Sequence, residues 1–124
     1  MARWIPVDPT GGLDLWAAGW GGLATMLFSA CLVAPLGEEI LYRGVLFQGL
    51  ANRFGPLAAA AGSALVFTIV HFYGLYGTLG VGILGIALAL VYHATRSLPA
   101  AIAFHAIYNL TVTLPDWIID HGPL

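Results

Sequence analysis

Charge is scarce in this sequence. Only ten of its 124 residues are Asp, Glu, Lys or Arg, a fraction of 8%, and there is no lysine at all. Typical soluble domains carry about 25% charged residues, because a small domain needs a polar surface to stay in water. The chain is instead 60% hydrophobic, with a mean hydropathy of +0.89. These values argue against an ordinary soluble domain and favour a lipid bilayer as the solvent.

The few charges and the single cysteine narrow the classes of function further. The net charge is −2 and the four arginines are scattered along the chain, so we expect no nucleic-acid partner. Cys31 stands alone, which excludes a disulfide framework within one chain. Its apolar neighbours favour a packed, small hydrophobic side chain over a nucleophile. The length suits one domain.

Long apolar segments dominate the rest of the sequence. A membrane-spanning helix needs about 20 apolar residues. Five segments approach that length, and Pro, Gly or polar residues separate them, with Pro35 and Gly37 marking the end of the first segment or a kink. The segments run over about 16–36, 37–54, 57–72, 78–95 and 98–114. They predict an all-α, polytopic transmembrane bundle of about five helices, some of them short or tilted.

The two ends of the chain differ from this core. Residues 1–15 hold two prolines and two aspartates where the apolar part of a signal peptide would lie, so they predict an irregular lead-in. Residues 16–114 form the predicted transmembrane core, and residues 115–124 the carboxyl-terminal tail. With five spans, Arg3, Arg53 and Arg96 fall on one side of the membrane, opposite the two tail aspartates. The positive-inside rule then places the amino terminus in the cytoplasm.

One charged cluster interrupts the apolar segments. Glu38, Glu39 and Arg43 lie within six residues of one another. In a loop between two spans such charges cost little, whereas inside a span they are expensive and usually functional. On a helix, Glu39 and Arg43 form a favourable i, i+4 pair, and Glu38 points about 100° away. The start of the predicted second helix would also favour negative charge. Two acids with different partners differ in proton affinity, which is how a site gains a general base.

Two further polar sets lie on other predicted helices. His71 follows Phe67 by one helical turn, and His105 and Asn109 share a face of the last helix at i, i+4. Glu38 opens the second predicted helix and His71 closes the third. If those helices are antiparallel neighbours, the two side chains lie at one level, and the last helix can supply His105 there. The sequence therefore predicts one polar pocket below the membrane surface.

A carboxylate and an imidazole can bind and deprotonate water, and an amide with a second imidazole can stabilise an oxyanion. This chemistry suits peptide hydrolysis without a nucleophilic Ser or Cys. Zinc remains open, since His and Glu are zinc ligands, although no His-Glu-x-x-His motif occurs. Each set also has a structural interpretation, as an ion pair or as interhelical hydrogen bonds worth about 0.6 kcal/mol each. We interpret His93 and His121 as interfacial.

These motifs resemble the three ordered motifs of the CPBP family of intramembrane proteases. Those motifs are Glu38-Glu39-x-x-x-Arg43, Phe67-x-x-x-His71 and His105-x-x-x-Asn109, with Ala34-Pro35 before the first and Gly44 after Arg43. The family includes type II CAAX prenyl proteases and bacterial proteins annotated for bacteriocin processing or abortive infection. The resemblance covers about residues 30–112. It implies a glutamate-dependent endopeptidase acting on a membrane-associated peptide or a lipidated, CAAX-type protein.

The resemblance also implies roles for the site residues. Glu38 and His71 would activate the water, and His105 and Asn109 would stabilise the oxyanion. Glu39 and Arg43 would support the site. We expect no cofactor, with zinc as the alternative, and an integral protein of a bacterial or archaeal membrane.

The chain departs from the family pattern in having only about one span before the first motif. That departure motivates an alternative function as a non-catalytic membrane partner, such as an immunity or scaffold protein. An ion or proton pathway is a third hypothesis.

Overall fold

The computed structural model describes residues 19–71 and 73–121, and these residues form helices joined by short turns, with no strand among them. The predicted all-α class is therefore confirmed. Predictions for the amino-terminal lead-in, including Arg3 and the start of the first helix, lie outside the described residues, as does the side chain of His121.

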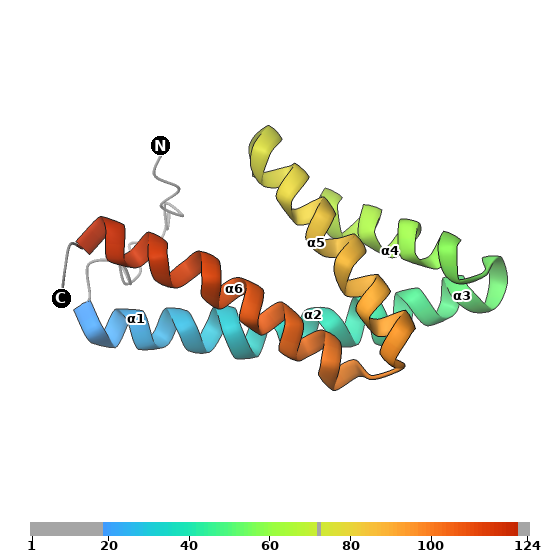
Figure 1. Ribbon diagram of the computed structural model, residues 1–124, viewed down its shortest axis with the longest axis horizontal. Coiled ribbons are helices and arrows are strands. Elements are labelled where there is room, and N and C mark those ends of the chain that lie inside the picture. Colours follow the sequence, from blue (N-terminus) through green and yellow to red (C-terminus); the bar gives the residue numbers. More distant parts are fainter. Residues whose placement is uncertain (1–18, 72, 122–124) are drawn as a thin grey trace.

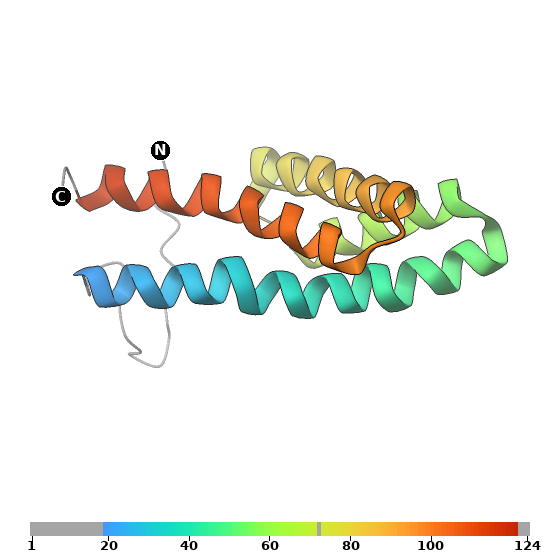
Figure 2. The ribbon, with the colours of Figure 1, turned by 60° about the horizontal axis from the view of Figure 1, so that its bottom comes forward.

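One long helix replaces the first two predicted helices. It consists of α1 (Gly19–Phe28), a π-helical segment η1 (Ser29–Val33), α2 (Ala34–Glu39), a second π-helical segment η2 (Ile40–Phe47) and α3 (Gln48–Phe54). These segments continue without interruption over 36 residues (Figures 1 and 2). No helix ends at Pro35 or Gly37, so that alternative of the prediction is wrong. The widened π turn just before Pro35 accommodates its ring and its missing N–H, as local π adjustments do in other membrane helices.

Three further helices follow, so the chain has four continuous helices in its described part where about five were predicted. They are α4 (Pro56–Val70), α5 (Gly74–Thr95) and α6 (Leu98–His121). Gly55, with φ of 87°, makes the turn into α4, a conformation that favours glycine. α6 continues beyond the predicted end at Leu114 with Pro115 inside it. Trp117 stabilises this extension, because its side chain is only 1% exposed and its ring centroid lies 5.9 Å from that of Trp20.

The long helix and α6 run antiparallel and side by side, while α4 and α5 form a hairpin over the second half of the long helix (Figures 1 and 2). Two apolar clusters hold the hairpin to this pair, one around Phe47 and Tyr92 and one around Phe67 and Leu88. The long helix, α5 and α6 are long and apolar enough to span a membrane. α4 has 15 residues and rises roughly 22 Å, less than the hydrocarbon thickness of about 30 Å.

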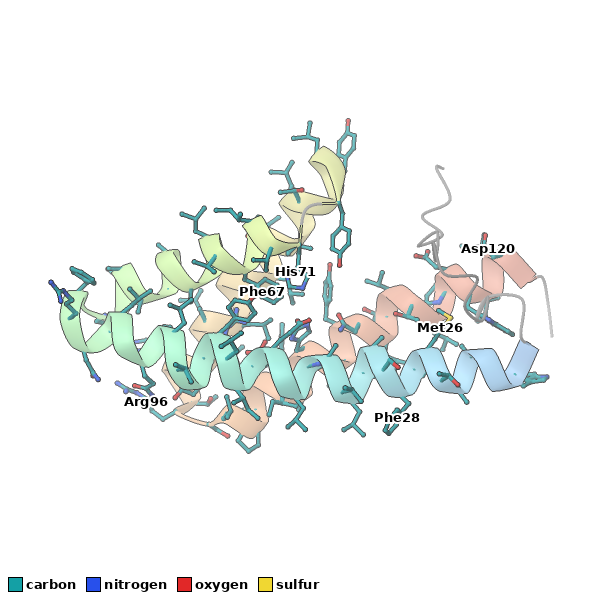
Figure 3. All side chains as sticks on the ribbon, turned by 180° about the vertical axis from the view of Figure 1, so that it is seen from behind. Met26, Phe28, Phe67, His71, Arg96 and Asp120 are labelled. Carbon is teal, nitrogen blue, oxygen red and sulfur yellow. The ribbon has the colours of Figure 1, made fainter. Side chains whose placement is uncertain are left out.

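The charged ends of the molecule are segregated. Arg96 and Asp120 lie at opposite ends (Figure 3). α3, with Arg53 in its last turn, ends at the same end of the molecule as Arg96, as predicted, but the unbroken helix puts Gly19 at the acidic end. The five-span assumption behind the predicted topology is therefore wrong. Applied to this fold, the positive-inside rule predicts that the arginine end faces the cytoplasm.

Candidate active site

A buried ion pair forms the base of the site. Arg43 Nη1 lies 3.0 Å from Glu39 Oε1, and both side chains are completely buried. Arg43 Nη2 donates to the carbonyl of Gly85 on α5 at 2.7 Å. Gly85 also lets α5 lie close to α4, since a Cβ there would lie 3.3 Å from the backbone of Ala64. Three helices thus fix the charge of Glu39 in place, and the predicted i, i+4 pair is present.

His105 is oriented by that pair. Its Nδ1 lies 2.8 Å from Glu39 Oε1. Because Glu39 is paired with Arg43 and accepts hydrogen bonds, Nδ1 carries the proton in this contact. The other ring nitrogen, Nε2, faces Glu38 Oε2 at 3.6 Å. A buried carboxylate therefore sets both the tautomer and the orientation of this imidazole.

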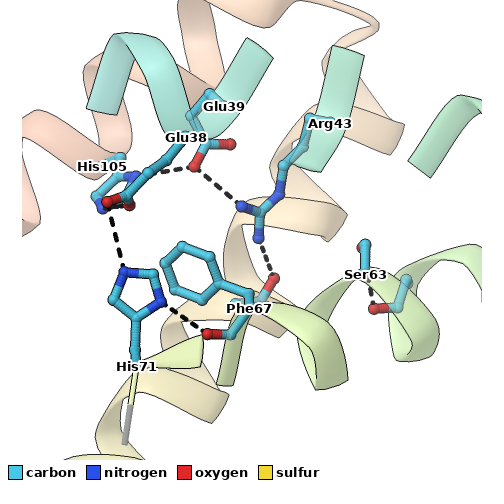
Figure 4. Close-up of polar contacts among 9 residues, drawn as sticks. Glu38, Glu39, Arg43, Ser63, Phe67, His71 and His105 are labelled. Atoms are coloured by element: carbon cyan, nitrogen blue, oxygen red, sulfur yellow. Dashed lines mark hydrogen bonds and ion pairs between the residues drawn. The ribbon is translucent and has the colours of Figure 1, made fainter. Parts of the chain in front are cut away.

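His71 approaches Glu38 from the opposite side. It ends α4, and its Nδ1 lies 2.7 Å from the carbonyl oxygen of Phe67, one turn earlier. A carbonyl accepts only, so Nδ1–H is the donor and Nε2 faces Glu38 Oε1 at 3.4 Å. The Glu38 carboxylate therefore lies between two imidazole Nε2 atoms, each opposite one of its oxygens (Figure 4).

The aromatic ring of Phe67 packs against most of these groups. Its centroid lies 4.4 Å from the ring of His71 and 5.8 Å from that of His105, and Arg43 Cζ is 5.1 Å from it. Phe67 is 1% exposed. In the sequence, Phe67 stands out only by its spacing from His71. In the structure, its ring packs against the polar cluster from the α4 side (Figures 3 and 4).

Glu38 and His71 are the accessible members of the cluster. Their side chains are 27% and 20% exposed, whereas Glu39 and Arg43 are fully buried and His105 is 3% exposed. The arrangement is a half-open carboxylate and imidazole in front of a sealed ion pair. It can hold a polar ligand or a water at Glu38 while the inner groups keep their geometry.

Glu38 and His71 meet at one level, as predicted, but for a different reason. Glu38 lies in the middle of the long helix, so the predicted helix amino terminus beside it is absent. It precedes Phe54 by 16 residues, and His71 follows Pro56 by 15 residues. These two nearly equal lengths of antiparallel helix bring the residues to the same depth. The groups that stabilise negative charge here are side chains, not a helix dipole.

Asn109 lies apart from this arrangement. Its Nδ2 donates to the carbonyl of Ala30 in η1 at 2.7 Å. Tyr42 packs edge-on against the ring of Phe67. His93 lies away from the cluster, 6.3 Å from the ring of Phe47. Among the described residues, no group of three or more His, Cys, Asp or Glu side chains is arranged to hold a metal ion.

The charges of the cluster are unevenly paired. Arg43 balances the buried carboxylate of Glu39, whereas Glu38 faces the two imidazoles. Ionisable groups at membrane depth are expensive and usually functional. A carboxylate between two imidazoles has the composition of a general acid–base site.

These observations define the class: a polytopic helical membrane protein with a half-buried Glu/His site formed between its helices. The profile of the type II CAAX prenyl endopeptidase Rce1-like family matches residues 20–111, which is most of the chain and a range that includes the six predicted site residues. The chain therefore belongs to the type II CAAX prenyl endopeptidase Rce1-like family, a family of membrane-embedded proteases. No curated protein and no solved structure shows significant similarity to it.

Proposed function

We propose that this chain is an intramembrane glutamic endopeptidase that hydrolyses a peptide bond in a membrane-associated, CAAX-type lipidated substrate. The observation that carries the proposal is the position of Glu38 between the Nε2 atoms of His71 and His105, at 3.4 and 3.6 Å. Family membership supports the reaction class. The lipidated substrate suits a site whose surroundings are apolar and whose accessible side is Glu38 and His71.

In this proposal a water molecule lies against Glu38 and His71. Glu38 accepts a proton from the water as its oxygen attacks the carbonyl carbon of the scissile bond. The C–N bond then breaks, and the proton passes to the leaving amine. Water is consumed, a carboxyl and an amino terminus are formed, and the enzyme is regenerated.

His105 stabilises the oxyanion of the tetrahedral intermediate. When its Nε2 is protonated, the imidazolium presents an N–H donor beside Glu38, and Glu39 stabilises its positive charge through Nδ1. Arg43 in turn forms an ion pair with Glu39. The buried pair thus supports the reacting groups without touching the substrate.

The test is cleavage of a panel of prenylated and unprenylated peptides by the purified protein in detergent. Glu38→Gln should lower kcat at least about 100-fold, since general acid–base catalysis contributes about 10²–10⁴-fold. Asp116→Asn on the exposed last turns of α6 is the matched control and should leave kcat unchanged. Equal cleavage by wild type and Glu38→Gln would refute the glutamate mechanism.

Each reaction is also run with and without a zinc chelator. Cleavage that is indifferent to the chelator supports water activation by side chains alone. Loss of cleavage in the wild type on chelation would assign Glu38, His71 and His105 to a metal centre instead. No cleavage of any peptide by folded protein would favour the non-catalytic partner function.

A further inference from the structure

The carbonyl of Ala30 lacks its usual partners within the long helix. In an α register it would accept from the N–H of Ala34, and in a π register from residue 35. The Ala34 N–H is bonded to the carbonyl of Ser29 instead. Residue 35 is proline, which has no N–H. Neither register supplies a backbone donor to Ala30.

Asn109 of α6 supplies the missing donor. Its Nδ2 lies 2.7 Å from the Ala30 oxygen. A backbone carbonyl without a partner is strongly disfavoured in a segment that crosses lipid, where water does not replace the bond. Pro35 is buried, Ala30 is half-buried, and the bond between Asn109 and the Ala30 carbonyl is partly shielded from the surroundings. The amide of Asn109 and the ring of Pro35 therefore complement each other.

The position of this contact links it to the site. Asn109 follows His105 by one turn on the same face of α6. α6 is thus bonded to the long helix at two successive turns, by Asn109 to Ala30 and by His105 to Glu39. In the bond to Ala30, Asn109 uses the side-chain amide that the family resemblance assigns to stabilising the oxyanion.

We infer that Pro35 and Asn109 form one lock, in which proline frees the Ala30 carbonyl and Asn109 binds it, so that Asn109 acts as a positioning residue for His105. The Pro35–Asn109 lock bears on the proposed function because it places a group of that site. Its two tests below do not depend on peptide cleavage, so failure of the lock and failure of the protease assignment are distinguishable.

The first test is a double-mutant cycle read by thermal unfolding in detergent. Asn109→Ala leaves the Ala30 carbonyl without a donor and should lower Tm by about 4–8 °C. In Pro35→Ala, residue 35 gains an N–H that can bond Ala30 within the helix. Asn109→Ala should therefore cost less than half as much in that background. An equal loss in both backgrounds, or no loss in either, overturns the lock.

Two matched variants control for the chemistry of the substitutions. Asn52→Ala removes an exposed amide at the end of the long helix and should leave Tm unchanged. Pro56→Ala lies at the start of α4, where an N–H is not needed, so the cost of Asn109→Ala should remain full in that background. If Asn109→Ala alone does not fold, folding of the Pro35→Ala/Asn109→Ala protein is the expected rescue, and its failure refutes the inference.

The second test asks whether Asn109 positions His105 or only adds stability. Protein labelled with ¹⁵N at histidine is compared by NMR well below its Tm, with the His105 ring signals assigned by their loss in His105→Gln. Asn109→Ala should shift the His105 ring signals, whereas Asn52→Ala should not. Unchanged His105 signals together with a lowered Tm would reduce Asn109 to a structural residue and overturn its positioning role.

Discussion

Removal of Arg43 should be among the most destabilising single changes in this protein. Arg43→Met deletes the 3.0 Å contact with Glu39 and the 2.7 Å bond to the Gly85 carbonyl. It leaves a completely buried carboxylate whose remaining partner is His105. Removing one partner of a buried ion pair costs about 3–5 kcal/mol, because the other charge stays uncompensated. We expect a loss of that size in the free energy of unfolding.

The assay is unfolding in mixed micelles, followed by tryptophan fluorescence. Arg53→Met is the matched control, because Arg53 is exposed at the end of α3 and lies over the ring of Phe54. It should cost less than about 1 kcal/mol, as exposed cation–π contacts do. Glu39→Gln combined with Arg43→Met removes both charges and should recover most of the stability lost by Arg43→Met alone. A double variant as unstable as Arg43→Met, or a single variant no worse than Arg53→Met, would refute the argument.

Two further predictions concern the packing around the site. Gly85→Ala places a methyl group 3.3 Å from Ala64 and Phe67 and should lower the free energy of unfolding by about 1–3 kcal/mol. Gly37→Ala has open space around it and should be neutral or slightly stabilising. Unfolding curves of the two variants check this, and equal effects would contradict it. Phe67→Ala should lower the free energy of unfolding by about 3–5 kcal/mol and should lower peptide cleavage by more than the unfolded fraction explains. Phe67→Leu should retain most of the stability and most of the activity. Activity proportional to the amount of folded protein would refute a role of the ring in the site.

The sequence was sufficient to predict the helical membrane class and that members of the three polar sets meet, although Asn109 of the third set bonds Ala30 instead. Apolar length and the scarcity of charge determine the first, and helical spacing places Glu39 opposite Arg43. The continuity of the long helix was not predictable, because a proline usually ends a helix and the π turn before Pro35 has no sequence signature of its own. Glu38 and His71 lie at one level, as predicted, although Glu38 lies inside a helix and not at its start.

The backbone acceptors were also beyond sequence reasoning. Every residue has a carbonyl, and only the packed register of the helices shows that Arg43 reaches Gly85 and that Asn109 reaches Ala30. A glycine in α5 indicates that another group can approach the helix backbone, but it does not identify that group. The tautomers of His71 and His105 depend on the same contacts. These features require three-dimensional neighbours that helical periodicity does not specify.

The shortness of α4 has a geometric consequence for the site. The helix ends at Val70, and the next residue is the imidazole that faces Glu38. Helix length is therefore the dimension that sets the separation of the two groups along the bundle axis. One extra turn inserted in α4 would carry His71 about 5.4 Å past Glu38, farther than any side-chain rotation of the imidazole could recover. The number of residues in α4 thus has as much chemical meaning as the identity of the residue that ends it.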